Sequence, residues 1–256
     1  MHQPSELHTM NPQSRFSNRA EAYAKYRPSY PPEAIHFILK GLKSSDMLLI
    51  ADIGAGTGIA ARLLAAQGAT VIAIEPNLAM LAAAEPHPQV EFRQGSAEQT
   101  GLADGSVDLV TTFQSFHWFN PSKTLPEFAR ILKPNGRLAV VWNNRDRQDA
   151  FTAAYSELLR IASNQHPAQT VKQLTADIFA QSVFSLSQYQ SFRHSHSLNL
   201  AGLLGRTDSL SYIPEAGQVR DRLNQSLDEL YHQFCDQQGL VYLAHTTDVY
   251  LTSLTG

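Results

Sequence analysis

The residues with the clearest potential for chemistry are three closely spaced glycines in the segment DIGAGTG at residues 52–58. The segment follows a short apolar run and precedes a run with helical spacing, so we expect it to connect a buried strand to a helix. Glycine lets a ligand approach the main chain closely, and the unpaired N–H groups at the start of the helix point toward that ligand. The segment therefore predicts a binding site for a small polar molecule.

An acidic residue, Glu75, ends the next apolar run after this helix. A carboxylate in that position can accept hydrogen bonds from both hydroxyls of a ribose, which favours a nucleoside ligand. A dinucleotide-binding loop has glycines at relative positions one, three and six. Counted from Gly54, the fifth position is Gly58 and the sixth is Ile59. This spacing disfavours a pyrophosphate, although an NAD-type oxidoreductase stays open as an alternative.

Two aromatic side chains, His117 and Trp118, follow the fourth apolar run. The carboxyl ends of parallel strands meet at one edge of a sheet, so we expect both residues to face the same crevice as the glycine segment. Histidine acts as a general base near neutral pH or as a binding residue, and both roles stay open. Trp142 ends the fifth apolar run and is expected in the core, with Asn143 and Asn144 following it at the rim.

These side chains need a sheet to position them. Short apolar runs alternate with stretches of helical spacing in the first half of the chain, which indicates βαβ units and a parallel sheet. The expected strands are residues 47–53, 71–74, 90–93, 108–113, 138–142, 189–199 and 240–254. The expected helices are residues 33–42, 59–67, 78–85, 122–132, 149–164, 170–180 and 219–234. The predicted fold class is α/β, with a seven-stranded, mostly parallel sheet and helices on both faces.

The second half of the chain mixes helices with the closing strands. We expect a flexible tail at residues 1–13 and a single domain at residues 14–256. Within that domain, residues 14–145 are expected to form the ligand-binding core with an N-terminal arm, and residues 146–256 a helical lid and the closing strands. A roofed site suits a small-molecule substrate.

The composition limits the remaining function classes. The chain has 256 residues, 43% of them hydrophobic, and a net charge of −3, so a largely disordered chain is excluded and no basic excess favours nucleic acid. A single cysteine excludes an internal disulfide and suits a reducing cytosol. The apolar runs are shorter than the roughly 18 residues of a membrane span. We expect a cytoplasmic monomer or homodimer, with neither a membrane nor a nucleic acid as partner.

No metal site is expected. His194 and His196 share one face of a predicted strand, but no cysteine and no clear third ligand lies near them in the sequence. We interpret this pair as a solvated strand face. The charged run Arg145-Asp146-Arg147 is likewise interpreted as solvated.

Four segments of the chain resemble class I methyltransferases that use S-adenosylmethionine. In chain order they are DIGAGTG at 52–58, EPNLAM at 75–80, GSAE at 95–98 and LKPNG at 132–136. The resemblance covers roughly residues 47–142. It implies a Rossmann-like fold, a helical lid inserted in the C-terminal half, and methyl transfer from S-adenosylmethionine.

Three further segments are similar to the branch of that family that includes trans-aconitate methyltransferases. They are YAKYRPSYP at 23–31, QSFHWF at 114–119 and LGRTDSLSY at 204–212, the last in the lid. This similarity implies a small-molecule acceptor such as a carboxylic acid.

The resemblance also implies a set of cofactor-binding residues: Arg27, Asp52, Gly54, Ala55, Gly56, Gly58, Glu75, Pro76, Met80, Ser96, Ala97, Glu98 and Gln114. By this resemblance, Asp52 supports the methionine amino group and Glu75 holds the ribose hydroxyls. Arg27 is expected to clamp the methionine carboxylate, because a guanidinium matches carboxylate geometry. Gln114 is expected to touch the methionine moiety.

The adenine contacts follow from the same resemblance. Met80 is expected to pack on the adenine face, and the backbone N–H of Ala97 to read its edge. Ser96 or Glu98 is expected to meet the exocyclic amine.

The expected catalytic residues are His117 and Trp118, and the acceptor decides their roles. A carboxylate is ionised at neutral pH and needs no general base, so the protein has only to recognise the anion. A phenol or an amine needs a base, for which His117 is the leading candidate. A catalytically silent S-adenosylmethionine-binding protein is the remaining alternative.

Overall fold

The computed structural model describes residues 19–166, 176–179 and 182–254. The tail predicted at residues 1–13 lies outside the described residues, as does most of the helix predicted at 170–180. The predicted single domain, with its division near residue 145, stays a prediction. No helix among the described residues is both long and apolar enough to cross a membrane.

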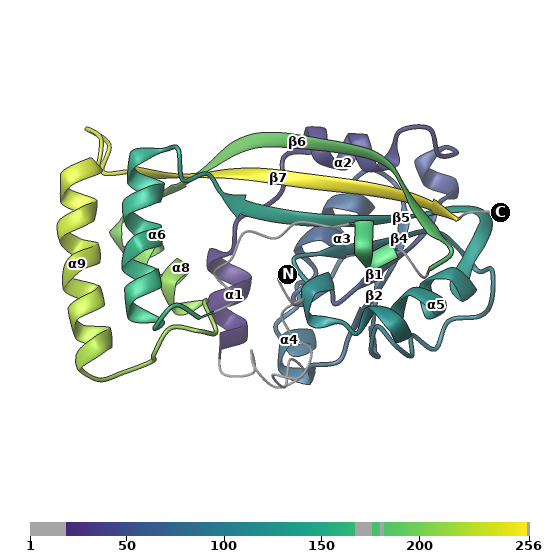
Figure 1. Cartoon of the computed structure of the whole chain (residues 1–256), viewed down its shortest axis with the longest axis horizontal. Coiled ribbons are helices and arrows are strands. Elements are labelled where there is room, and N and C mark those ends of the chain that lie inside the picture. The colour runs from purple at the N-terminus through teal and green to yellow at the C-terminus, as the bar shows by residue number, and fades with distance from the viewer. Residues whose placement is uncertain (1–18, 167–175, 180–181, 255–256) are drawn as a thin grey trace.

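A seven-stranded sheet runs through the molecule in the order β3-β2-β1-β4-β5-β7-β6 (Figure 1). The strands are β1 (Leu49–Ile53), β2 (Thr70–Glu75), β3 (Val90–Gln94), β4 (Val107–Phe113), β5 (Leu132–Arg145), β6 (Phe184–Leu198) and β7 (Val241–Leu254). The first five strands pair in parallel, whereas β7 is antiparallel to both β5 and β6. The predicted α/β fold with a mostly parallel, seven-stranded sheet is confirmed.

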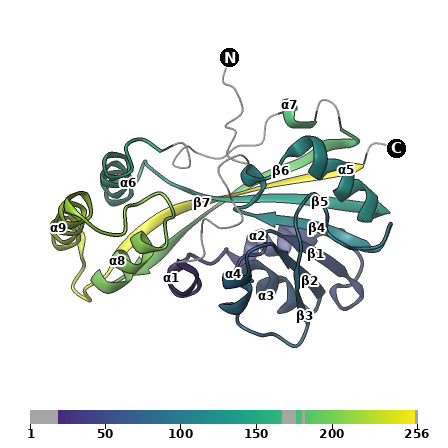
Figure 2. The same ribbon diagram turned by 90° about the horizontal axis from the view of Figure 1, so that it is seen from below.

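Helices cover both faces of the parallel half of the sheet (Figure 2). Helices α2 (Pro32–Leu39) and α3 (Ile59–Ala65) pack on one face, while α5 (Pro121–Ile131) packs on the other. Successive strand residues alternate between the two buried cores; Ile50 belongs to one core and Ala51 to the other. Burial on both faces explains why these strands are continuous apolar runs in the sequence.

A second group of helices lies at the end of β5, β6 and β7 that is farther from the parallel half of the sheet. Strands β5, β6 and β7 extend past the parallel half and reach helices α6 (Ala150–Ala162), α8 (Leu200–Asp208) and α9 (Gln218–Phe234), as Figure 1 shows. These helices share a separate apolar core with Val241 and Leu243 of β7. We call α6, α8 and α9 the helical cluster; it stands where a helical lid was predicted in the C-terminal half.

The N-terminal arm docks on the helical cluster. Helix α1 (Ala20–Tyr26) lies against α8, and a Cβ at Gly205 would come within 2.3 Å of the Tyr26 ring, so the close approach requires glycine. The guanidinium of Arg19 donates hydrogen bonds to the carbonyls of Leu210 and Ile213. The arm therefore holds the segment that follows α8 in place.

The structure differs from the sequence predictions chiefly in the second half. Strand β6 begins five residues earlier than expected (184 instead of 189), and most of its side chains are exposed. Its backbone ladder to β7 holds the strand, and the alternation seen at residues 189–199 does not indicate the earlier start. Strand β5 is likewise longer at both ends than the predicted 138–142. Helix α8 was expected as part of the lid segment but not as a helix.

Candidate active site

The glycine loop follows β1 at the edge where strand order reverses, between β1 and β4. Gly54 has a φ of +68°, and a Cβ there would lie 2.7 Å from the Cβ of Ser115. Gly58 has a φ of +77°, and its Cβ would lie 2.5 Å from the ring of Phe92. Both glycines are therefore needed for the conformation and for the space. Ligands bind at such reversals in open α/β sheets.

The Glu75 carboxylate is held by the main chain of this loop. One oxygen accepts a hydrogen bond from the N–H of Gly56 at 2.9 Å, and the other accepts one from the N–H of Asn77 at 2.9 Å. Burial raises the pKa of Glu75, and these two hydrogen bonds oppose the shift. Each oxygen keeps a lone pair, so the carboxylate is positioned to accept further hydrogen bonds from ligand hydroxyls.

Asp52 supplies a second buried acid, at the end of β1. Its Oδ1 accepts a hydrogen bond from the Thr111 hydroxyl at 2.8 Å, while its buried Oδ2 has no hydrogen-bond partner among the described residues. Burial is the largest cause that raises the pKa of Asp52 to about 7, and the charge of Glu75 adds to it. An unpaired carboxylate oxygen at a cavity suits a cationic group such as an ammonium. This carboxylate fits the amino group of S-adenosylmethionine as a hydrogen-bond acceptor.

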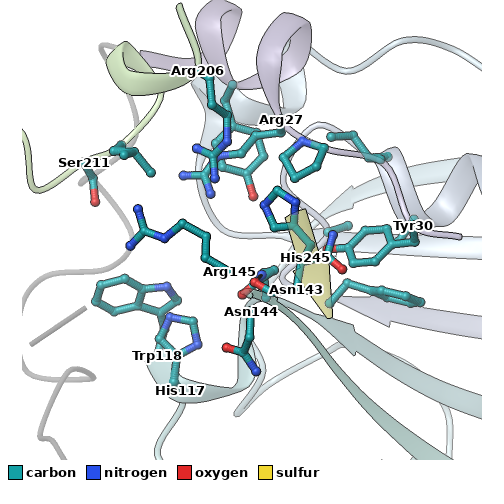
Figure 3. A pocket seen from close by; sticks show the side chains of 18 of the residues that line it. Arg27, Tyr30, His117, Trp118, Asn143, Asn144, Arg145, Arg206, Ser211 and His245 are labelled. Atoms are coloured by element: carbon teal, nitrogen blue, oxygen red, sulfur yellow. Dashed lines mark hydrogen bonds between the residues drawn. The ribbon is translucent and has the colours of Figure 1, made fainter. Parts of the chain in front are cut away.

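The cavity that Asp52 lines has a volume of about 130 Å³ and lies between the glycine loop, the arm and the helical cluster (Figure 3). Six of the predicted site residues line it: Arg27, Asp52, Ala55, Gln114, His117 and Trp118. Gln114 adopts a φ of +55° and its Nε2 donates to the carbonyl of Asn143 at 2.6 Å. Such backbone conformations concentrate at functional sites, which agrees with the prediction that Gln114 contacts the methionine moiety.

The other predicted residues lie along the loop and farther toward β3. Met80 is buried, and its Cε would lie 3.1 Å from a Cβ at Gly56, so the thioether flanks the loop. Glu98 accepts hydrogen bonds from the N–H of Asn120 and the hydroxyl of Thr124, which ties this segment to the start of α5. Residues outside the lining of this cavity are Gly54, Gly56, Gly58, Glu75, Pro76, Met80, Ser96, Ala97 and Glu98. Their cofactor contacts stay predictions.

His117 and Trp118 lie in the short 3-10 helix η4 (Phe116–Trp118), just beyond β4, and their ring centroids are 4.9 Å apart. The indole N–H of Trp142 donates to Nδ1 of His117 at 3.3 Å. A neutral ring whose Nδ1 accepts carries its proton on Nε2, so His117 presents a donor. Trp142 is buried in the core, as predicted. Its hydrogen bond orients His117 and opposes a role as general base through Nδ1.

Besides Arg147, three arginines meet at the cavity: Arg27 from the arm, Arg145 from the end of β5, and Arg206 from α8 (Figure 3). Within the described residues, no acidic side chain is paired with any of them. Each of the three has a buried guanidinium nitrogen to which no described residue offers a hydrogen-bond partner. Arg206 is 6% exposed, and burial together with the charge of Arg27 lowers its pKa to about 10. The site is therefore poised to receive an anion.

Of these three arginines, the sequence predicts only Arg27 as a site residue. Arg145 was interpreted as solvated, which is wrong, because β5 extends far enough to carry it into the cavity. Arg206 belongs to the lid segment LGRTDSLSY, and the resemblance of that segment assigns it no role. A short polar segment that resembles a lid, with one arginine among small residues, is the signal that could have singled it out.

Two more cavity residues come from β7 and β5. Nδ1 of His245 on β7 lies 2.9 Å from the carbonyl of Leu243, and its ring stacks on that of His194 with centroids 5.4 Å apart. Asn143 lines the cavity, but its amide donates to the carbonyl of Ser29 and accepts from Thr247. Asn143 therefore joins the arm to the sheet. Among the described residues, no three metal-ligating side chains gather at one point.

Comparison with known proteins agrees with this geometry. A family model for the methyltransferase domain matches residues 51–140. An uncharacterized methyltransferase of Mycobacterium bovis is 39% identical over 145 residues, which are 56% of this chain; the match spans 58% of that relative's length. An uncharacterized methyltransferase of Schizosaccharomyces pombe is 31% identical over 218 residues, which are 81% of this chain and 83% of the relative.

Solved structures share the fold. A protein of Anaeromyxobacter dehalogenans, provisionally named a type II methyltransferase, superposes with a TM-score of 0.66 over 90% of this chain and 98% of its own, at 19% identity. The YcgJ protein of Bacillus subtilis superposes with a TM-score of 0.54 over 88% of this chain and 99% of its own, also at 19% identity.

The class that the fold and the site define is an α/β protein that binds a nucleoside at the edge of a mostly parallel sheet. With the matches above, the chain belongs to the family of S-adenosylmethionine-dependent methyltransferases. An NAD-type oxidoreductase is not favoured by these matches.

Proposed function

We propose that this protein transfers the methyl group of S-adenosylmethionine to a carboxylate oxygen of a small acid. The observation that carries the proposal is the pair of guanidiniums of Arg145 and Arg206, which line the cavity without an acidic partner among the described residues. A buried cation without a counter-ion is unfavourable, and an anionic ligand relieves that cost. The acceptor supplies this anion.

The charges divide the cavity into two parts. Asp52 and Arg27 suit the ammonium and the carboxylate of the methionine moiety, respectively. Arg145 and Arg206 are then left for the acceptor. Figure 3 shows Arg145 reaching across the space between the rings of His117 and Trp118 and the guanidinium of Arg206.

S-adenosylmethionine supplies a methyl group on a positively charged sulfur: as the acceptor oxygen shares an electron pair with the methyl carbon, the carbon–sulfur bond breaks and its pair stays on sulfur. A carboxylate acceptor becomes a methyl ester, and no proton moves. The residues therefore have only to bind the anion, align one oxygen with the methyl group and exclude water. The arm and the helical cluster suit the last task.

His117 fits this chemistry as a binding residue. Because its Nδ1 accepts from Trp142, the neutral ring carries its proton on Nε2 and offers a donor there, which suits binding of an anion better than proton abstraction. A phenol or amine acceptor would instead need a lone pair at that position. The hydrogen bond thus favours an acceptor that is already ionised.

Methyl transfer from labelled S-adenosylmethionine to pooled small acids, phenols and amines tests the proposal. Mild alkali hydrolyses methyl esters and releases volatile labelled methanol, whereas ethers, N-methyl and C-methyl products keep the label. Volatile label is the expected result. Label that resists alkali would contradict a carboxylate acceptor and would return His117 to the role of base.

A further inference from the structure

The imidazole of His245 belongs to a buried side chain that lines the cavity, and one of its ring nitrogens lacks a hydrogen-bond partner among the described residues. The side chain is 1% exposed, it lines the cavity, and its Nε2 has no hydrogen-bond partner in the part of the chain that the structure describes. Nδ1 lies 2.9 Å from the carbonyl oxygen of Leu243, an atom that can only accept. Nδ1 is therefore the protonated nitrogen, and Nε2 of the neutral ring carries a lone pair.

The surroundings of His245 keep this ring neutral. The charged and titratable groups that act on it come from three elements: Arg145 on β5, His194 on β6 and Arg206 on α8. Burial and these neighbours lower the pKa of His245 well below its ordinary value. A proton on Nε2 would add a cation beside two guanidiniums, so Nε2 accepts a hydrogen bond without taking the proton.

The same charges restrict the donor that can satisfy Nε2. An ammonium group is disfavoured beside Arg145 and Arg206, and the methionine ammonium has a better site at the unpaired Oδ2 of Asp52. The donor is therefore uncharged. A hydroxyl on the acceptor meets this requirement while its carboxylate is held by the neighbouring guanidiniums.

We propose that Nε2 of His245 accepts a hydrogen bond from a hydroxyl of the acceptor, so that the substrate is a hydroxy acid. This inference rests on the proposed function, because it assumes an anionic acceptor beside Arg145 and Arg206. His245 then selects the substrate, and it takes no proton during methyl transfer. Leaving a buried acceptor unpaired costs more than an apolar group in its place, which makes such a site discriminate strongly against acids that lack the hydroxyl.

Matched pairs of acids test this role by calorimetry on the protein saturated with S-adenosylhomocysteine. The pairs are propionate and lactate, succinate and malate, benzoate and salicylate, and phenylacetate and mandelate. In at least one pair, the hydroxy acid is expected to bind at least about tenfold more tightly, the effect of one net hydrogen bond. The variant His245→Phe should lose this preference while keeping its affinity for the unsubstituted acid. The variant His245→Gln, whose amide oxygen accepts, should restore part of it.

A control variant and an NMR measurement distinguish a hydrogen bond to His245 from a merely structural effect of the substitution. His194→Phe alters the ring stacked on His245 and should keep the preference for the hydroxy acid. In protein labelled with ¹⁵N-histidine, the Nε2 resonance of His245 should shift toward that of a hydrogen-bonded nitrogen with the hydroxy acid alone. Unchanged affinity for S-adenosylhomocysteine shows that each variant is folded.

The outcomes separate this inference from the proposed function. Acids that bind without a hydroxyl preference, or a preference that survives in His245→Phe, overturn the role of His245 and leave the carboxylate acceptor intact. Failure of every acid to bind overturns the proposed function and this inference with it. Label that resists alkali when a hydroxy acid is the acceptor would place the methyl group on the hydroxyl and overturn the binding role.

Discussion

The two parts of the predicted site are built in different ways. The predicted cofactor end includes the neighbouring loops after β1 and β2, beside the cavity, where Glu75 is fixed by the backbone N–H groups of Gly56 and Asn77. The proposed acceptor end draws Arg145 from β5, Arg206 from α8 and His245 from β7. The loops of the first end carry two buried acids, Asp52 and Glu75, and lie within one βαβ unit. The second end is basic and exists only because distant segments meet.

Because of this difference, the two ends of the site suit different ligands. Buried carboxylates at one end suit the hydroxyls and the ammonium of a nucleoside cofactor, whereas unpaired guanidiniums at the other suit an acceptor anion. Substitutions at the two ends should therefore separate: one set changes cofactor binding, and the other changes acceptor binding. The following predictions test that separation.

Replacing both acceptor-end arginines, by Arg145→Met and Arg206→Met, should have the largest effect. Two lost charged hydrogen bonds amount to about 3–4 kcal/mol, so kcat/KM for the acceptor should fall roughly 10²- to 10³-fold. The binding of S-adenosylhomocysteine, measured by calorimetry, should change little. The melting temperature should not fall, because Arg206 is a buried cation without an acidic partner among the described residues. An equal loss of cofactor affinity would erase the distinction between the two ends.

At the cofactor end, Glu75→Ala should weaken S-adenosylhomocysteine binding by about 1.5–3 kcal/mol, the value of hydrogen bonds to a charged group. Glu91→Ala is the matched control, because it removes an exposed carboxylate paired with Arg93 on β3. The control should bind the ligand as the wild type does. Unchanged binding in Glu75→Ala would remove this residue from the cofactor site.

The binding of S-adenosylhomocysteine should also depend on pH through Asp52. With a pKa of about 7, this carboxyl is protonated below neutrality and must lose its proton to hold an ammonium. The dissociation constant should therefore rise as pH falls below 7, by up to about tenfold per pH unit. Asp52→Asn should bind more weakly and without this dependence, measured by calorimetry across pH 5.5–8. A wild-type curve that is flat through pH 7 would contradict the assignment.

The same raised pKa fixes the sign of its effect on stability. Between the ordinary carboxyl pKa of about 4 and the folded value of about 7, the folded protein binds more protons than the unfolded chain. The contribution of Asp52 to the free energy of unfolding should therefore decrease as pH rises through this window and level off above it. Urea unfolding of the wild type and of Asp52→Asn at several pH values measures the difference.

The smallest effect is expected from Trp142→Phe, which keeps an aromatic ring in the core but removes the indole N–H that orients His117. A lost hydrogen bond of about 0.5–1.5 kcal/mol should raise the acceptor KM up to roughly tenfold. Cofactor affinity should stay unchanged. A rise in the dissociation constant of S-adenosylhomocysteine with no change in acceptor KM would place His117 at the cofactor end instead.

Local patterns in the sequence were enough for the parallel half of the fold. Its strands are buried on both faces, so each one is a continuous apolar run, and the glycines between β1 and α3 mark the loop. In the second half of the chain, the side-chain pattern of the long strands indicates their bounds less clearly. Strand β6 is largely exposed and is held by backbone pairing, so its start and its length do not follow from the side chains.

By itself, the sequence determined the class of fold, the family and the loop with its acidic residues, because these features depend on spacing within short segments. Only the tertiary structure brought Arg145, Arg206 and His245 to one cavity and showed that they have no acidic partners among the described residues. It also fixed the tautomers of His117 and His245, since each depends on a hydrogen bond whose geometry the long strands and their neighbours create. Charge and protonation in a buried site follow from which groups meet there, and sequence spacing does not encode that.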